Sequence, residues 1–142
     1  MFIGQYSHTL DDKNRLALPA RFRADSEHGL ALTAGTDKYL LAYALPEFEK
    51  LAEKVDALQL IGQEAATLRR LLYVNAAVSE LDKQGRVLLP EHLRTHAEIE
   101  KDAVVVGVGK FIEIWSPKNW EQAKAEVQDA ATQKHIWAKL GI

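Results

Sequence analysis

Two arginines in this chain each follow an aspartate by four residues, a spacing at which the two side chains can meet across a tight turn. Asp11 precedes Arg15, and Asp82 precedes Arg86. A carboxylate can brace a guanidinium, which then offers its planar fork of N–H donors to guanine O6 and N7 or to phosphate. The alternative is a surface pair that only closes a hairpin, and such a pair contributes about 0 to 1 kcal/mol.

Both pairs belong to an internal repeat. LDDKNRLALPARFR, from Leu10 to Arg23, returns as LDKQGRVLLPEHLR from Leu81 to Arg94, at a constant offset of 71 residues from position 11 to position 82. Leu, Asp, Arg, Leu, Pro and Arg coincide in the two copies without a gap. A period held this strictly indicates a duplicated structural unit.

Each copy predicts a three-residue turn, Asp12-Lys13-Asn14 in the first and Lys83-Gln84-Gly85 in the second. Loops of this length tend to be a type I turn followed by a residue in the left-handed region. Asn14 and Gly85 hold that third position, and asparagine and glycine are the residue types that tolerate positive φ best. Although Asn14 and Gly85 are different residue types, both suit the same left-handed backbone conformation.

The residues after each turn predict a short strand and then a short helix. Leu16 and Leu18 alternate with Ala17, as Val87 and Leu89 do with Leu88, which is typical of a strand with one buried face. Pro19 and Pro90 suit the first position of a helix, so short helices are expected over 20–25 and 91–97.

The remaining elements repeat the same plan in each half. Strands are expected over 2–10, 29–35, 39–43, 77–81, 103–107 and 110–115, and helices from Pro46 to about Leu60, over 63–73 and from Pro117 to about Leu140. The 63–73 helix should turn Ala66, Leu68, Leu71 and Leu72 to the core. The apolar points of the last helix, Ile136, Trp137 and Leu140 among them, suggest packing on a neighbour.

Composition limits the function classes. A chain of 142 residues that is 47% hydrophobic can bury one core shared by two halves. It has no cysteine, which excludes disulfides and thiolate sites. No signal peptide and no apolar run of about eighteen residues is evident, so a soluble, cytoplasmic protein with no membrane partner is expected.

The net charge of −2 argues at first against nucleic acid, but its distribution favours it. The two motif copies hold seven basic and four acidic residues, a net of +3, which leaves −5 for the rest of the chain. If the copies lie side by side, they form one positive patch on an acidic body.

Other sites are weakly indicated. His92 and His96 have a zinc-like spacing, but a third ligand is not evident. The sequence from Gly107 to Lys110 resembles a phosphate loop but continues as a strand. No serine or threonine has a recognisable nucleophile setting, so we expect no enzyme, no metal, no cofactor and no small-molecule substrate.

The doubled motif, after an N-terminal Met-Phe, resembles the MraZ family, part of the SpoVT-AbrB swapped-hairpin superfamily of transcription factors. The resemblance covers nearly the whole chain; Asn14 departs from the family's usual glycine, and Gln84 stands where the first loop has Lys13. It implies an α+β protein in which two β-hairpin modules, residues 5–48 and 76–120, form an intramolecular pseudo-dimer, with connecting helices over 49–75 and a C-terminal helix over 121–142.

The resemblance further implies a regulator, expected to be an autoregulatory repressor, that binds guanine-containing direct repeats in double-stranded promoter DNA of the division and cell-wall gene cluster. It implies a ring-shaped homo-oligomer associated with the nucleoid. Arg15 and Arg86 would contact bases or phosphates, with Asp11, Asp82, Asn14 and Gly85 shaping the loops. Five further cations would contact phosphates: Lys13, Lys83, Arg21, Arg23 and Arg94.

A second reading has a different class of partner. An oligomeric scaffold or antitoxin-like protein could use the same hairpin module to hold another protein without recognising a DNA sequence. A long apolar C-terminal segment would favour it, and the stretch from Ile136 to Ile142 keeps this alternative open.

Overall fold

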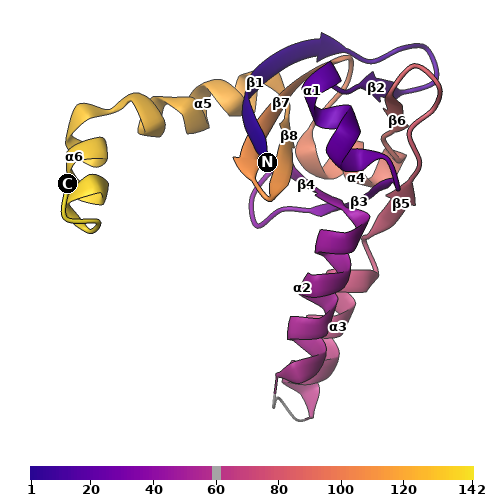
Figure 1. Cartoon of the computed structure of the whole chain (residues 1–142), viewed down its shortest axis with the longest axis horizontal. Coiled ribbons are helices and arrows are strands. Elements are labelled where there is room, and N and C mark those ends of the chain that lie inside the picture. The colour runs from indigo at the N-terminus through magenta and orange to yellow at the C-terminus, as the bar shows by residue number, and fades with distance from the viewer. Residues whose placement is uncertain (59–61) are drawn as a thin grey trace.

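The computed structural model describes residues 1–58 and 62–142 as a mixed α+β fold with two antiparallel sheets (Figure 1). Its strands are β1 (Phe2–Thr9), β2 (Arg15–Ala17), β3 (Leu30–Ala34), β4 (Leu40–Ala44), β5 (Ala77–Ser79), β6 (Arg86–Leu88), β7 (Asp102–Gly109) and β8 (Phe111–Trp115). The helices in the described residues are α1 (Ala20–Arg23), the 3-10 turn η1 (Ala24–Ser26), α2 (Leu45–Ala57), α3 (Gln63–Tyr73), α4 (Glu91–Ala97), α5 (Pro117–Gln128) and α6 (Ala130–Ala138).

The larger sheet is assembled from both halves of the chain. Its strand order is β1-β7-β8-β4-β3-β5, and every pairing in it is antiparallel. The first strand of each half pairs with a strand of the other half, because β1 lies along β7 and β5 lies along β3. Neither half therefore completes a sheet without the other.

The smaller sheet contains only β2 and β6, the strands that follow the two predicted turns. Leu16 faces Val87 in its antiparallel register. These two side chains and Leu18 and Leu89 are at most 1% exposed, whereas Leu88 is 51% exposed. Each fully buried leucine or valine stabilises the fold by about 1.5 to 3 kcal/mol, so this seam fixes the positions of both turns.

The short helices cover this core from both halves. Phe22 of α1 and Leu93 of α4 are buried in it, and the Phe22 ring meets those of Phe2 and Tyr6 edge-on, with centroids 5.1 and 5.3 Å away. Pro19 precedes the first residue of α1 rather than occupying it, and Pro90 does the same for α4. The first helix is also shorter than predicted, since Ala24–Ser26 tighten into a 3-10 turn.

Helices α2 and α3 form a hairpin that projects away from the sheet (Figure 1). The prediction that Leu71 faces the core is wrong: its side chain is 64% exposed, and no residue of α3 is buried. Helix α3 packs against α2, and Ala66, Leu68 and Leu72 are only partly buried. Helix α2 ends at Ala57, and Leu60, where its end was predicted, lies outside the described residues.

The predicted last helix is two helices. Asp129 interrupts it with extended backbone, and its carboxylate accepts the Thr132 N–H at 2.8 Å as the N-cap of α6. Helix α5 is anchored by Trp120, whose indole packs on Trp115 with ring centroids 5.8 Å apart. Helix α6 has no buried residue, and Figure 1 shows it at the far end of the α5 arm.

No helix within the described residues is both long enough and apolar enough to cross a bilayer.

Candidate nucleic-acid interface

Each predicted loop is closed by its own aspartate. Asp11 Oδ1 accepts the backbone N–H groups of Lys13 and Arg15 at 3.0 and 2.9 Å, and the Asp11 carbonyl accepts the Asn14 N–H at 3.0 Å. Asn14 has φ 59°, in the left-handed region that the turn requires. The loop therefore keeps its shape through backbone bonds to one carboxylate.

The second loop has the same geometry. Asp82 Oδ1 accepts the N–H groups of Gln84 and Arg86, both at 2.9 Å, and the Asp82 carbonyl accepts the Gly85 N–H at 3.0 Å. Gly85 has φ 73°, the counterpart of the asparagine in the first loop. The conformational match that the two sequences predict is confirmed.

The two loops lie side by side and share their charges. Arg15 Nε donates to its own Asp11 at 2.8 Å, and its Nη1 lies 3.6 Å from Asp82 of the other loop. Arg86 Nε likewise donates to Asp82 at 2.8 Å, while its Nη1 donates to Asp11 at 3.2 Å. These four side chains, the charge quartet, hold both guanidinium planes in one fixed arrangement.

Backbone donors stabilise the ionised carboxylates. The Arg15 N–H is the main cause that holds the pKa of Asp11 below its ordinary value, and the Arg15 side chain adds to it. The Arg86 N–H lowers the pKa of Asp82 in the same way. Partial burial opposes both shifts without reversing them. Both aspartates of the charge quartet thus stay ionised at neutral pH.

The charge quartet is only partly covered. Its four side chains are 26–30% exposed, so solvent screens its ion pairs and each contributes little to stability. No hydrogen bond within the described residues involves the Nη2 group of either arginine. The bracing therefore fixes the orientation of both arginines and leaves their Nη2 groups without a hydrogen-bond partner among the described residues.

The other predicted cations fall into two groups. Lys13 and Lys83, in the two loops, and Arg21, in α1, are exposed. Arg23 and Arg94 each make one hydrogen bond within their own half. Arg23 Nε donates to the Leu18 carbonyl at 3.1 Å, and Arg94 Nε donates to the Leu89 carbonyl at 2.9 Å. Each bond ties a short helix to the residue that follows the strand of its own half, Leu18 after β2 and Leu89 after β6.

Sequence reasoning missed how the halves interlock at the loops. The Leu18 N–H donates to the Gly85 carbonyl, and the Leu89 N–H to the Asn14 carbonyl, both at 3.0 Å. A Cβ on Gly85 would collide with the Arg23 guanidinium, which lies directly over that glycine. The only signal in the sequence is an arginine five residues after Leu18 and again after Leu89.

The histidines make backbone contacts instead of converging on a common point. His92 Nε2 lies 3.2 Å from the Asn75 carbonyl, and His96 Nε2 lies 2.8 Å from the Asp37 carbonyl. In the part of the chain that the structure describes, no three metal-ligating side chains gather.

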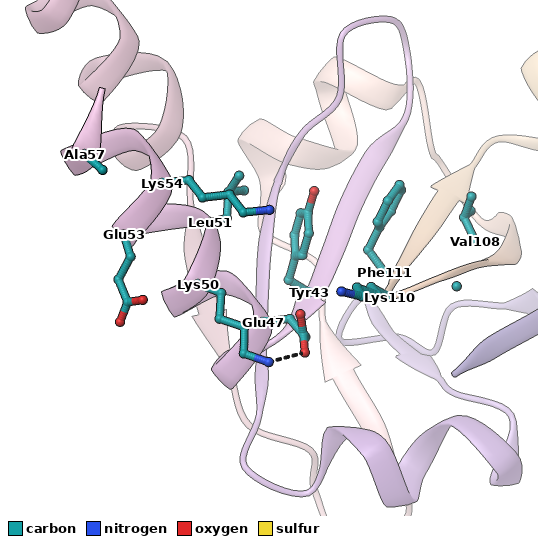
Figure 2. A pocket seen from close by; sticks show the side chains of 11 residues that line it. Tyr43, Glu47, Lys50, Leu51, Glu53, Lys54, Ala57, Val108, Lys110 and Phe111 are labelled. Carbon is teal, nitrogen blue, oxygen red and sulfur yellow. Dashed lines mark hydrogen bonds and ion pairs between the residues drawn. The ribbon is translucent and has the colours of Figure 1, made fainter. Parts of the chain in front are cut away.

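A hollow of about 810 Å³ lies elsewhere, between α2 and the β7–β8 turn (Figure 2). Tyr43 and Phe111 form its floor, and Lys50 at its rim pairs with Glu47 at 3.1 Å. It shares no residue with the loops or the charge quartet.

The fold and the paired loops define a class of protein: a duplicated α+β module in which two Asp-x-x-x-Arg turns meet on one surface. The family model described as "MraZ protein, putative antitoxin-like" matches residues 1–71 and again residues 72–138. The two matches start 71 residues apart, which is the offset of the internal repeat. This chain belongs to the MraZ family.

Curated relatives agree over most of the chain, and each is named transcriptional regulator MraZ. A protein of Herpetosiphon aurantiacus is 47% identical over 92% of both chains. One of Thermomicrobium roseum is 46% identical over 89% of both, and one of Desulfitobacterium hafniense is 43% identical over the full length of both. These relatives support a transcriptional regulator, a class that is typically not enzymatic.

Proposed function

We propose that this protein is a sequence-specific DNA-binding regulator that recognises guanine-containing direct repeats in promoter DNA. The observation that carries this proposal is the charge quartet, because it holds two partly exposed guanidinium groups in fixed positions on adjacent loops. Its target is the division and cell-wall gene cluster, and it acts there as an autoregulatory repressor. Family membership supports this assignment.

The arginines of the quartet make the sequence-reading contacts. A braced guanidinium can donate two parallel hydrogen bonds to guanine O6 and N7, each such pair giving about 1 to 3 kcal/mol of discrimination against other bases. Arg15 and Arg86 take this role or contact phosphate, while Asp11 and Asp82 keep them oriented.

The surrounding cations contact phosphates. Each neutralised phosphate adds about −0.9 to the slope of log affinity against log salt concentration, so the few contacts that one chain can make give modest affinity. Lys13, Lys83 and Arg21 are exposed for this purpose. The guanidinium groups of Arg23 and Arg94 join them through their Nη atoms, since their Nε atoms are occupied.

The two modules, residues 5–48 and 76–120, form the swapped-hairpin pseudo-dimer within one chain. The pairing of β1 with β7 and of β5 with β3 supports this arrangement, because each half supplies a strand to the other. Residues 49–75 connect the modules, and residues 121–142 form a C-terminal arm.

Assembly into a ring raises the affinity. A ring of chains can engage several direct repeats at once, which multiplies affinity by about 10² or more without new contacts. The exposed apolar side chains of the C-terminal arm support contacts between chains: Trp137 is 50% exposed and Leu140 69%. The assembly works in the cytoplasm, on the nucleoid.

A binding titration tests the proposal. A fluorescent duplex from the promoter upstream of the protein's own gene is titrated with wild type, Arg15→Ala and Arg15→Lys, against a scrambled duplex and at two salt concentrations. Arg15→Ala should lose about 1 to 3 kcal/mol per site, and Arg15→Lys should keep the salt dependence but lose base preference. Lys54→Ala, an exposed cation on α2, is the matched control. Equal affinity of Arg15→Ala and wild type for intact and scrambled duplexes would refute the proposal.

A second candidate is a protein-binding scaffold or antitoxin-like module. The exposed apolar side chains of α6 and the family description "putative antitoxin-like" favour it. In that case Trp137→Ala would abolish capture of a protein partner, and Arg15→Ala would change neither partner capture nor DNA affinity.

A further inference from the structure

The paired loops are built around a local two-fold axis. Leu16 faces Val87 in the β2–β6 register, and these residues hold equivalent positions in the repeat. The charge quartet obeys the same symmetry, because each guanidinium contacts its own aspartate and that of the other loop. A DNA-binding surface with exact two-fold symmetry selects a palindromic sequence, since both half-sites of the DNA meet the same side chains.

The loop tips break this symmetry. Asp12 of the first loop stands where the second has Lys83, and Lys13 stands where the second has Gln84. All four side chains are exposed. The two charges at the first tip cancel, whereas the second tip carries one positive charge.

Each short helix lies beside the loop of the other half, so the charges of the helices add to the charge difference between the two loop tips. Arg23 lies over Gly85, and the Leu18 N–H donates to the Gly85 carbonyl, so α1 stands beside the second loop. The Leu89 N–H donates to the Asn14 carbonyl, which brings α4 beside the first loop.

Helices α1 and α4 also differ in charge, and the more positive helix, α1, lies beside the more positive loop. Helix α1 carries Arg21 and Arg23 and no acidic residue, whereas Arg94 of α4 is balanced by Glu91. Lys83 and the residues of α1 together supply three cations and no acid; Asp25, in the η1 turn after α1, is paired with the N-terminal amine at 3.0 Å. The first-loop end has two cations and two acids, and the charge quartet between the ends is neutral.

We propose that the loop pair binds its DNA element in a single orientation, with the second loop and α1 as the strongly held end. This inference rests on the proposed function. A DNA-binding surface whose two loops are related by approximate two-fold symmetry but differ in charge prefers a DNA element whose two half-sites differ in sequence. Copies of such an element must then repeat head to tail when neighbouring chains in one ring bind them in the same orientation.

Two loop exchanges test the orientation. Asp12→Lys with Lys13→Gln and Asn14→Gly makes the first loop identical to the second, and glycine is compatible with φ 59° at that site. Lys83→Asp with Gln84→Lys writes the first tip into the second loop and keeps Gly85. The first exchange raises the net charge by one and the second lowers it by one, so a pure charge effect would move affinity in opposite directions.

The assay starts with enrichment of a duplex from a random DNA pool by the wild-type full chain. Two palindromes are then made from the enriched element, each by doubling one of its halves. Wild type should bind the enriched element about tenfold more tightly than either palindrome, within the discrimination expected of single side-chain contacts. The first exchange should prefer the palindrome of the half held by the second loop, and the second exchange the other palindrome.

The outcomes separate this inference from the function beneath it. If wild type enriches no element, both are overturned. If wild type enriches an asymmetric element and both exchanged variants keep the same preference, the orientation inference fails and the DNA-binding function stands. A palindromic element enriched by wild type also overturns the inference alone. Circular dichroism of each variant, matching wild type, excludes misfolding as the cause.

Discussion

Replacing Gly85 with alanine should destabilise the fold for two separable reasons. Its backbone has φ 73°, where an L-residue with a Cβ is strained. The new methyl group would also displace the Arg23 guanidinium, which lies over the glycine while its Nε bonds the Leu18 carbonyl.

The two contributions give a magnitude. The left-handed backbone costs alanine about 1 to 2 kcal/mol. Loss of the Arg23 hydrogen bond adds about 1 kcal/mol. Gly85→Ala should therefore lower the free energy of unfolding by about 2 to 3 kcal/mol. Asn14→Ala is the matched control, because Asn14 has φ 59° but already carries a Cβ; its cost should be about 1 kcal/mol or less.

Urea denaturation at fixed protein concentration measures these changes. In an Arg23→Ala background there is no guanidinium to displace, so Gly85→Ala should cost only the backbone part, about 1 to 2 kcal/mol. The same cost in both backgrounds would show that Arg23 does not restrict Gly85. A cost below about 0.5 kcal/mol in wild type would contradict the left-handed turn itself.

Three further changes test other parts of the structure. Asp11 and Asp82 have pKa values below the ordinary 3.8, so the folded state binds fewer protons than the unfolded state near that pH. Their contribution to stability is present above pH 3.8 and is lost as the pH falls through the lowered pKa values. In urea unfolding from pH 5 to 2, the stability of the double Asp→Asn variant should therefore fall less steeply with pH than that of wild type. Asp129→Ala removes the N-cap of α6 and should destabilise that helix by about 1 kcal/mol, seen as faster amide exchange in α6 with the sheet unchanged; unchanged exchange would show that the cap is not needed. Trp137→Glu should reduce the mass of the assembly in light scattering if α6 joins the chains, and an unaltered mass would exclude that role.

Local signals account for the elements that the sequence predicts well. The left-handed conformations of Asn14 and Gly85 and the start of α4 after Pro90 depend on residues only a few positions apart. The burial of Leu16 and Val87 follows from alternation along two short strands. Such preferences act within a turn or two of backbone, so one sequence is enough to state them.

The wrong predictions concern elements whose burial or length depends on contacts with residues distant in the sequence. Leu71 has the spacing of a core residue, but its side chain stays exposed, because α3 projects with α2 away from the sheet (Figure 1). The C-terminal helix has an unbroken helical pattern, yet Asp129 leaves it to cap α6. An apolar period shows that a face can be buried and does not identify what will cover it.

The sequence by itself determined that two equal turns exist, what conformation each adopts, and that an aspartate closes each around an arginine. Only the tertiary structure decided that the turns meet, that each guanidinium is shared between two carboxylates, and that Arg23 of one half lies over Gly85 of the other. The physical reason is distance along the chain. A turn is specified by torsion preferences of neighbouring residues, whereas contacts between residues some seventy positions apart arise only when both halves bury their apolar strands in one core.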